Sequence, residues 1–151
     1  VFFPSYSYLN AVCDAFIAKY PESSLLVQKP RMTDIDRQQF LDQFDGEAVC
    51  GFAVMGGIFG EGVDLKGDTS RFQIVCKIPY PYLGDKLVKK RMNKWKWWYP
   101  LQTAKIIVQS VGRSIRNEED HAVTYILDAG WDYFYSKNKT IFPKDFQECI
   151  V

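Results

Sequence analysis

Closely spaced metal ligands are missing from this 151-residue chain. It has a single histidine, His121, and four cysteines at positions 13, 50, 76 and 149, none within four residues of another. Zinc sites and redox pairs need ligands a few residues apart, so the sequence predicts no metal site. A Gly-x-Ser-x-Gly turn is also absent, and the histidine therefore has no sign of membership in a hydrolase triad.

Long apolar runs and a strong net charge are missing too. No apolar run approaches the 18 residues of a membrane helix, and the first residues lack the basic-then-apolar pattern of a signal peptide. We therefore expect no membrane partner and a cytoplasmic location. The formal net charge is only +1, so attraction for a polyanion would have to come from local basic patches.

The composition is that of one globular domain, and strand and helix signals alternate along the chain. Apolar residues make up 47% of the chain and charged residues 25%, and the length suits a single domain over 1–151. Strands are predicted at 1–3, 25–27, 48–55, 72–78 and 122–127. Helices are predicted to start after Ser5, after Thr33 or Asp34, and at Pro100, and to cover 83–94, 131–135 and 143–150. Such alternation predicts an α/β fold with a mostly parallel central sheet flanked by helices.

The most informative segment is 109–116, which reads Gln-Ser-Val-Gly-Arg-Ser-Ile-Arg. On a helix opened by Pro100, Gln109, Gly112, Arg113 and Arg116 fall within a sector of about 100°. The predicted core stripe of that helix is Leu101, Ala104, Val108, Val111 and Ile115. The polar sector lies beside this stripe, which is the position of a helix face that borders a cleft. A solvated helix face is the simpler alternative, but the glutamine, the glycine and the planar arginine donors together favour anion binding.

The pattern Gln-x-x-Gly-Arg-x-x-Arg resembles the sixth motif of superfamily 2 helicases. The surrounding sequence is similar to the second motor domain of a DinG/XPD-like superfamily 2 DNA helicase. The stretch 1–6 resembles the fourth motif, 57–68 the fifth, 78–81 the strand end that follows it, and 126–128 the strand after the sixth. These stretches occur in the family's order and extend from position 1 to about 135. The resemblance implies a RecA-like domain.

For the sixth motif, the resemblance implies a catalytic role. Arg113 and Arg116 would act as arginine fingers on the γ-phosphate of ATP. Gln109 would position the nucleotide or the attacking water, and Gly112 would lie against the nucleotide.

For the fifth motif, the glycines allow a tight loop after the strand at 48–55, and Glu61 and Asp64 add acceptors for a ribose hydroxyl or an arginine. A structural glycine-rich loop with solvated acids is the alternative. The resemblance favours a loop that couples nucleotide to nucleic acid, with Gly62 and Asp64 nearest the nucleotide.

Two segments are candidates for binding nucleic acid. Ser5 and Tyr6 follow the first strand, where a helix cap and a core aromatic explain them equally well. The segment 86–99 interleaves six basic residues with four aromatics. Lys89, Lys90 and Arg91 are the candidate contacts to single-stranded DNA, whereas the tryptophans could instead pack on a core or on a neighbouring domain.

Two motifs of a complete helicase are absent here: a Gly-x-x-x-x-Gly-Lys-Ser/Thr phosphate loop and an Asp-Glu-x-His box. The family carries them on its first motor domain, which would also hold Mg²⁺ and, in many members, an iron–sulfur cluster. We therefore expect a monomeric fragment of a larger helicase whose partners are single-stranded DNA and the first motor domain of the same polypeptide. It would hydrolyse no ATP alone, and in a prokaryote it would associate with the nucleoid.

The alternative is a stand-alone nucleic-acid-binding module that has a motor fold but no ATPase cycle. The full-length gene would decide between the two readings, because only the motor requires a phosphate loop upstream.

Overall fold

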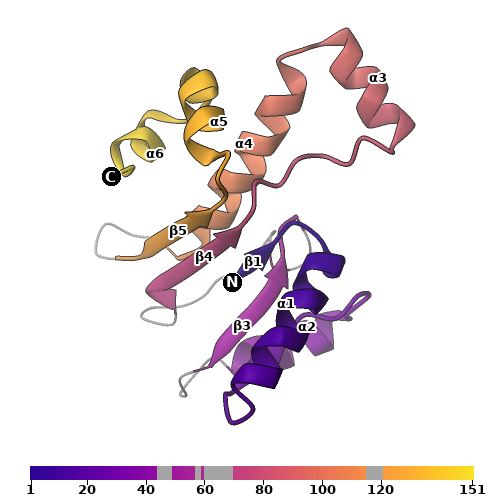
Figure 1. Cartoon of the computed structure of the whole chain (residues 1–151), viewed down its shortest axis with the longest axis vertical. Helices are drawn as coiled ribbons and strands as arrows, with labels where there is room; N and C mark the ends of the chain where they lie inside the picture. Colours follow the sequence, from indigo (N-terminus) through magenta and orange to yellow (C-terminus); the bar gives the residue numbers. More distant parts are fainter. Residues whose placement is uncertain (44–48, 57–58, 60–69, 115–120) are drawn as a thin grey trace.

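The computed structural model describes residues 1–43, 49–56, 59, 70–114 and 121–151, with the backbone alone at position 113 (Figure 1). The strands are β1 (Phe2–Phe3), β2 (Leu25–Val27), β3 (Cys50–Val54), β4 (Phe72–Cys76) and β5 (Val123–Leu127). The helices are α1 (Tyr6–Lys19), α2 (Asp34–Asp42), α3 (Lys86–Lys94), α4 (Trp98–Val111), α5 (Trp131–Asn138) and α6 (Lys144–Glu148), with short 3₁₀ turns at Gly112–Ser114 and Lys139–Ile141. No helix in these ranges is both long enough and apolar enough to cross a membrane.

The strands form one sheet in the order β2-β3-β1-β4-β5, and every neighbouring pair is parallel. The α/β fold with a parallel central sheet that the sequence predicts is therefore confirmed. Because the strands all run in one direction, their carboxyl ends share one edge of the sheet and their amino ends share the other. Ligands of open parallel sheets usually bind beyond the carboxyl edge.

Strand β1 lies at the centre of the sheet although it has only two residues. Phe2 pairs with Ala53 of β3 and with Val75 of β4, and Phe3 pairs with Val54. The two phenylalanine side chains point to opposite faces, as successive residues of a strand must. Each is buried in a different core cluster.

Helices cover the two faces of the sheet unequally. Helix α1 packs on one face, where Leu9 and Cys13 contact the cluster around Phe3. The other face is covered by α2 and α4, while α5 and α6 extend the core around Ile107 of α4. Figure 1 shows α1 in front of β3 and α4 behind β4 and β5.

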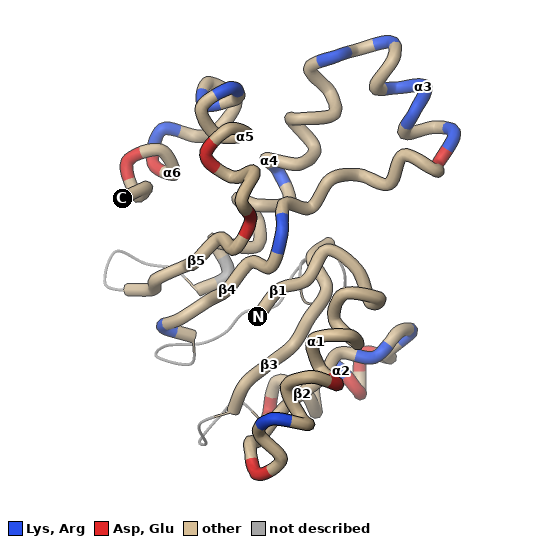
Figure 2. The backbone as a smooth tube through the Cα atoms, in the orientation of Figure 1, with Lys and Arg blue, Asp and Glu red and all other residues tan. Residues whose placement is uncertain are grey.

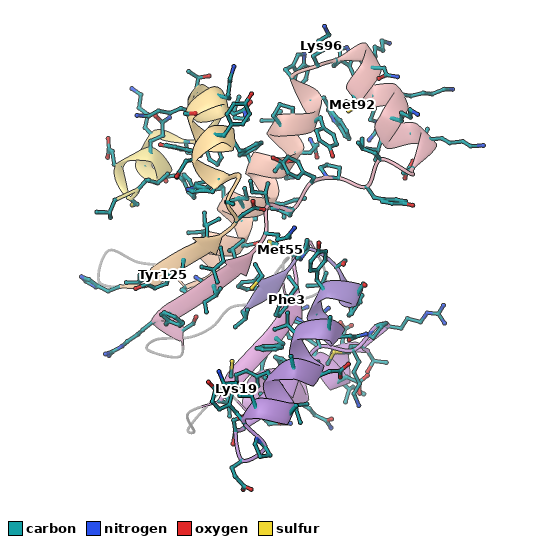
Figure 3. The ribbon with its side chains drawn as sticks, viewed as in Figure 1. Phe3, Lys19, Met55, Met92, Lys96 and Tyr125 are labelled. Atoms are coloured by element: carbon teal, nitrogen blue, oxygen red, sulfur yellow. The ribbon has the colours of Figure 1, made fainter. Side chains whose placement is uncertain are left out.

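The predicted strand at 122–127 is present as β5, but the expectation from its apolar sequence, that it lies in the core, is wrong. Strand β5 is at the edge of the sheet, and α4 and α5 cover only one of its faces. Val123, Tyr125 and Leu127 are exposed on the other face, together with Phe72 of β4. Figure 3 labels Tyr125 on this strand. The rings of Phe72 and Tyr125 are in contact, with centroids 5.3 Å apart.

Asp128 joins three elements at the carboxyl edge. Its Oδ2 accepts a hydrogen bond from the Ile78 backbone N–H (2.9 Å) after β4, and its Oδ1 accepts one from Gly130 (2.7 Å) before α5. The bond from Ile78 lowers the pKa of the Asp128 carboxyl most, burial opposes it, and Gly130 and the charge of Lys77 lower it further. This carboxylate therefore holds the end of β4 to the start of α5.

The Asp128 contribution to stability should depend on pH. A carboxyl whose pKa is lowered by folding stabilises the fold above its unfolded pKa, about 3.9, and loses that contribution as pH falls through the folded value. We expect Asp128→Asn to lower the free energy of unfolding at pH 7 by about 1–3 kcal/mol, and to flatten its decline below about pH 4. Denaturant titrations at several pH values measure both effects.

Asp132→Asn is the matched control, since Asp132 is exposed in the first turn of α5. Asp132→Asn should have little effect on the free energy of unfolding at pH 7 or on its decline below about pH 4. Equal acid profiles for wild type and Asp128→Asn would refute the role given to Asp128.

Candidate functional site

The sixth-motif segment does not continue as one α-helix. Helix α4 ends at Val111, where the Gly112 N–H donates to the carbonyls of Ser110 and Val108, and Gly112–Ser114 is a 3₁₀ turn. The prediction of a single helical face through Arg116 is therefore wrong. Glycine is the poorest ordinary helix former and is frequent at helix ends, which explains why the helix stops there. Arg116, together with Ile115 of the predicted core stripe, lies outside the described residues.

The buried line of α4 also differs from the predicted stripe. Its buried residues are Thr103, Ala104, Ile107 and Ser110, whereas Leu101, Val108 and Val111 are half-buried. Two of the buried residues are polar, and their hydroxyls donate to carbonyls one turn earlier: Thr103 to Tyr99 (3.2 Å) and Ser110 to Ile106 (2.9 Å). Gln109 is half-buried beside this line.

Polar side chains at the start of β4 contact the sixth-motif turn. Gln73 is 2% exposed, and its Nε2 donates to the Val111 carbonyl at 3.0 Å. The Ser114 hydroxyl donates to the Ser70 hydroxyl at 2.7 Å. The turn therefore lies near the amino edge of the sheet. Sequence patterns gave no indication of Gln73, which reads as a polar interruption of an apolar strand.

The fifth-motif segment starts at the carboxyl end of β3. Gly56 there has φ +71°, in the left-handed region that glycine adopts without strain. Phe59 is buried, and its ring packs on Phe40 of α2 with centroids 4.4 Å apart. Further along the chain, Ser70 lies two residues before the start of β4. The segment thus connects the two edges of the sheet. The candidates within it, Glu61, Gly62 and Asp64, lie outside the described residues.

Ser5 and Tyr6 both have structural roles at the carboxyl edge. Ser5 is the N-cap of α1, and its hydroxyl accepts a hydrogen bond from Tyr8 N–H at 3.4 Å. The Tyr6 hydroxyl donates to the Lys29 carbonyl (3.3 Å) and accepts from Gln28 Nε2 (3.0 Å). Gln28, buried directly after β2, also accepts from Val54 N–H at 2.7 Å. Sequence reasoning did not identify Gln28, whose only signal is a glutamine after an apolar run.

The basic residues of the segment 86–99 lie on α3 and beyond it. Asp85 caps α3, and its Oδ1 accepts from Leu87 N–H at 2.7 Å. None of the α3 residues is buried, and Lys89, Lys90 and Arg91 are all exposed. Figure 2 shows basic residues along α3, which projects away from the sheet. The arrangement is that of a solvated cationic surface.

The aromatic residues after α3 are only partly packed. Trp97 is 60% exposed, and Trp98 is half-buried with the Arg91 guanidinium 5.6 Å from its ring centre. The Tyr99 hydroxyl donates to the Pro81 carbonyl at 3.0 Å, and burial raises the pKa of this phenol. A cavity of about 450 Å³ lies between α3 and α4, and Figure 3 labels two of the residues beside it. It is lined by Met92, Asn93, Lys96, Tyr99 and Pro100.

One further cation lies at the carboxyl edge. Lys77 directly follows β4 with φ 72°, a left-handed conformation that is uncommon for residues other than glycine. Its Nζ is 5.3 Å from the centre of the Tyr8 ring on α1. No sequence pattern had pointed to Lys77.

The structure therefore separates the candidate residues into two groups. Ser5, Tyr6 and the basic helix α3 lie on the carboxyl side, because α3 follows the carboxyl end of β4. Gly112 and the Arg113 backbone lie at the amino side, since α4 runs from α3 back to the start of β4 (Figure 1).

Comparison with known proteins identifies a family for this arrangement. The chain matches the Helicase C-terminal domain family over residues 1–149. It is 31% identical over 151 residues to the Regulator of telomere elongation helicase 1 homolog of Drosophila virilis, with 85% of this chain and 15% of the fly protein covered. It is 30% identical over 155 residues to the ATP-dependent DNA helicase CHL1 of Kluyveromyces lactis, with 85% of this chain and 19% of the yeast protein covered. The chain thus spans less than a fifth of either relative's length.

A solved structure supports the fold. The C-terminal part of the Fun30 ATPase domain superposes with a TM-score of 0.51 and 13% sequence identity, covering 89% of this chain and 37% of that one. The parallel sheet of this chain therefore has the RecA-like motor fold that the motifs imply. With the family match extending over 1–149, the chain belongs to the helicase C-terminal domain family, among relatives of the DinG/XPD-like type.

Proposed function

We propose that the chain is the second motor domain of an ATP-dependent DNA helicase that moves 5′ to 3′ on single-stranded DNA. The observation that supports this most directly is the placement of the sixth-motif turn at one edge of the sheet and of Ser5, Tyr6 and α3 toward the other. A domain built this way can face nucleotide on one side and DNA on the other. The relatives' names, which describe DNA helicases, point the same way.

On the nucleotide side, Arg113 and Arg116 donate hydrogen bonds to phosphate oxygens as negative charge develops on them. Gln109 positions the nucleotide or the attacking water. An added Cβ at Gly112 would meet no atom of the described residues within 4 Å, which supports room for a phosphate to approach this part of the turn closely. When bound, ATP supplies the phosphoryl group whose transfer drives movement, while the first motor domain holds Mg²⁺ and the remaining phosphates.

The fifth-motif residues Glu61, Gly62 and Asp64 would couple the two sides. Their segment begins at the carboxyl end of β3 and ends beside the sixth-motif turn, at Ser70. A change at the nucleotide can therefore reach the DNA edge through one continuous stretch of backbone.

On the DNA side, Lys89, Lys90 and Arg91 contact phosphates, and Ser5 and Tyr6 lie along the same strand. Such contacts do not read base sequence. The exposed ring of Trp97 offers a face on which an unpaired base can stack.

In the full-length polypeptide, Arg113→Ala or Arg116→Ala should lower ATP hydrolysis by about 10³–10⁵-fold, because an arginine finger stabilises charge that exists only in the transition state. Lysine should not restore activity, since it lacks the planar fork of donors. Phosphate release at saturating ATP and DNA measures this, and DNA affinity should change little.

Lys105→Ala serves as the charge-matched control, because Lys105 is exposed on α4, the helix that precedes the turn. The isolated chain should release no phosphate, as it lacks a phosphate loop. Near-normal turnover in an alanine variant would remove the role given to that arginine.

Gly112 and Gly56 should respond differently to alanine. At Gly112, where φ is −67° and an added Cβ meets no atom, Gly112→Ala should preserve stability or raise it by about 0.4–1 kcal/mol. It should nevertheless raise KM for ATP in the full-length polypeptide, because the methyl group occupies space meant for the nucleotide. Gly56→Ala should lower stability by about 1–2 kcal/mol, since its φ is +71°. Unchanged ATP affinity in Gly112→Ala would exclude close contact there.

Changing Lys89, Lys90 and Arg91 together to glutamine should weaken single-strand binding regardless of base sequence. The slope of log affinity against log salt should become shallower by about 2, at about 0.7 for each lost phosphate contact. Binding titrations over a range of salt concentrations measure the slope.

The control removes the same charge from α5, α6 and the turn between them, by changing Lys137, Lys139 and Lys144 to glutamine; all three are exposed. Its salt slope should match that of wild type. Identical slopes for the two triple variants would show that α3 is not on the DNA path.

A further inference from the structure

The turn that carries Arg113 is attached to β4 at two points, one on either side of the arginine. Before it, the Val111 carbonyl accepts from Gln73 Nε2 at 3.0 Å. After it, the Ser114 hydroxyl donates to Ser70 at 2.7 Å. Gln73 and Ser114 are both buried, at 2% and 6% exposure. Between these points lie only Gly112 and Arg113, so the backbone of the arginine has little freedom to shift.

Gln73 is an unusual choice for its position. It lies in a buried strand two residues from Val75, which is fully buried. Its Oε1 is also buried and has no hydrogen-bond partner in the described part of the chain. An unsatisfied buried acceptor is unfavourable, and an apolar side chain would fill the same space without that cost. Among the residues that the structure describes, the polar contact that explains a glutamine here is the bond to the helix end.

The bond to Val111 has a clear physical effect. The last carbonyls of an α-helix have no partner within the helix, so the chain beyond them is free to fray. Gln73 satisfies the final carbonyl of α4 from β4, an inner strand of the sheet. The end of α4 is thereby fixed relative to the sheet, and with it the start of the turn.

Ser70 links this attachment to the fifth motif. It is the residue at which the fifth-motif segment reaches β4, and its hydroxyl accepts the bond from Ser114 inside the sixth motif. The sixth-motif turn is therefore bonded to a residue only two positions after the end of the fifth motif.

We propose that Gln73, together with the Ser70–Ser114 pair, forms a clamp that positions the Arg113 turn for catalysis. The three residues are positioning residues, since they act on the nucleotide only through Arg113. The proposal rests on the proposed function, because it gives the clamp a role in ATP hydrolysis. If the clamp only supported the fold, its loss would lower stability and activity together. If it positions the arginine, its loss lowers the rate of the chemical step and leaves stability unchanged.

The first test is Gln73→Met in the full-length polypeptide. Methionine has a similar volume and length but no donor, so the core stays filled while the bond to Val111 is lost. We expect kcat to fall about 10- to 100-fold, the effect of a displacement on the order of 1 Å at a reacting group. KM for ATP and the melting temperature should change little.

Thr103→Val is the matched control. Thr103 is fully buried on the same helix, and the substitution removes one buried hydrogen bond, to Tyr99, while preserving shape. Its kcat should remain near that of wild type. A kcat in Gln73→Met equal to that of Thr103→Val would overturn the proposal. A fall in kcat that only equals the lost fraction of folded protein would also overturn the proposal.

The second test uses Ser70→Ala, Ser114→Ala and the double variant, which remain informative if Gln73→Met does not fold. If the two hydroxyls act through each other, each single variant should lower kcat by a similar factor and the double variant no further. Additive losses, or no loss, would overturn the coupling between the motifs.

Arg113→Ala separates this inference from the proposed function. If it abolishes hydrolysis while Gln73→Met and the serine variants do not lower kcat, the clamp is wrong and the motor assignment stands. If Arg113→Ala retains full turnover, the motor assignment itself is wrong.

Discussion

The fold depends on the pairing of two residues, Phe2 and Phe3, with strands on both sides. Without β1, the pair β2-β3 and the pair β4-β5 would have no hydrogen-bonded connection. The Met55 N–H donates to the Phe3 carbonyl at 2.8 Å, which sets where β3 ends and where the fifth motif begins. The two buried rings fill opposite cores, and each contributes about 1.5–3 kcal/mol of hydrophobic stabilisation. Both edges on which the candidate residues lie are therefore aligned through this dipeptide.

Much of the fold could be predicted from the sequence because its signals are local. Ser5 is the N-cap of α1, as predicted, and Thr33, one of the two predicted candidates, is the N-cap of α2. The apolar run at 72–78 contains β4, and 83–94 contains α3. Two features were beyond such reasoning. Periodicity cannot tell that Thr103 and Ser110 are buried, because their hydroxyls are satisfied by the helix backbone. An apolar strand also does not reveal that it lies at an edge with one open face.

The candidate site was only partly predictable, for a related reason. The sequence pattern extended the helix through Gly112 and Arg113, whereas α4 ends at Val111 and these two residues lie in a 3₁₀ turn. Gln28 and Gln73 were missed because their importance comes from partners 22 to 38 residues away. A single glutamine in an apolar segment has no spacing pattern to detect. The roles of Arg116, Glu61, Gly62 and Asp64 remain predictions.

The open face of β5 has a consequence for how stability is distributed over the domain. Strand β3 is buried on both faces, whereas β5 is covered only on the face where Ile126 packs against α4 and α5; Val123, Tyr125 and Leu127 stay exposed on the other face. Less apolar area is lost when β5 separates from the sheet than when β3 does, so local opening there requires less free energy. The backbone amides of β5 are therefore expected to exchange with solvent earlier than those of β3. The strand that follows the sixth motif is thus a place where the domain can open without unfolding as a whole.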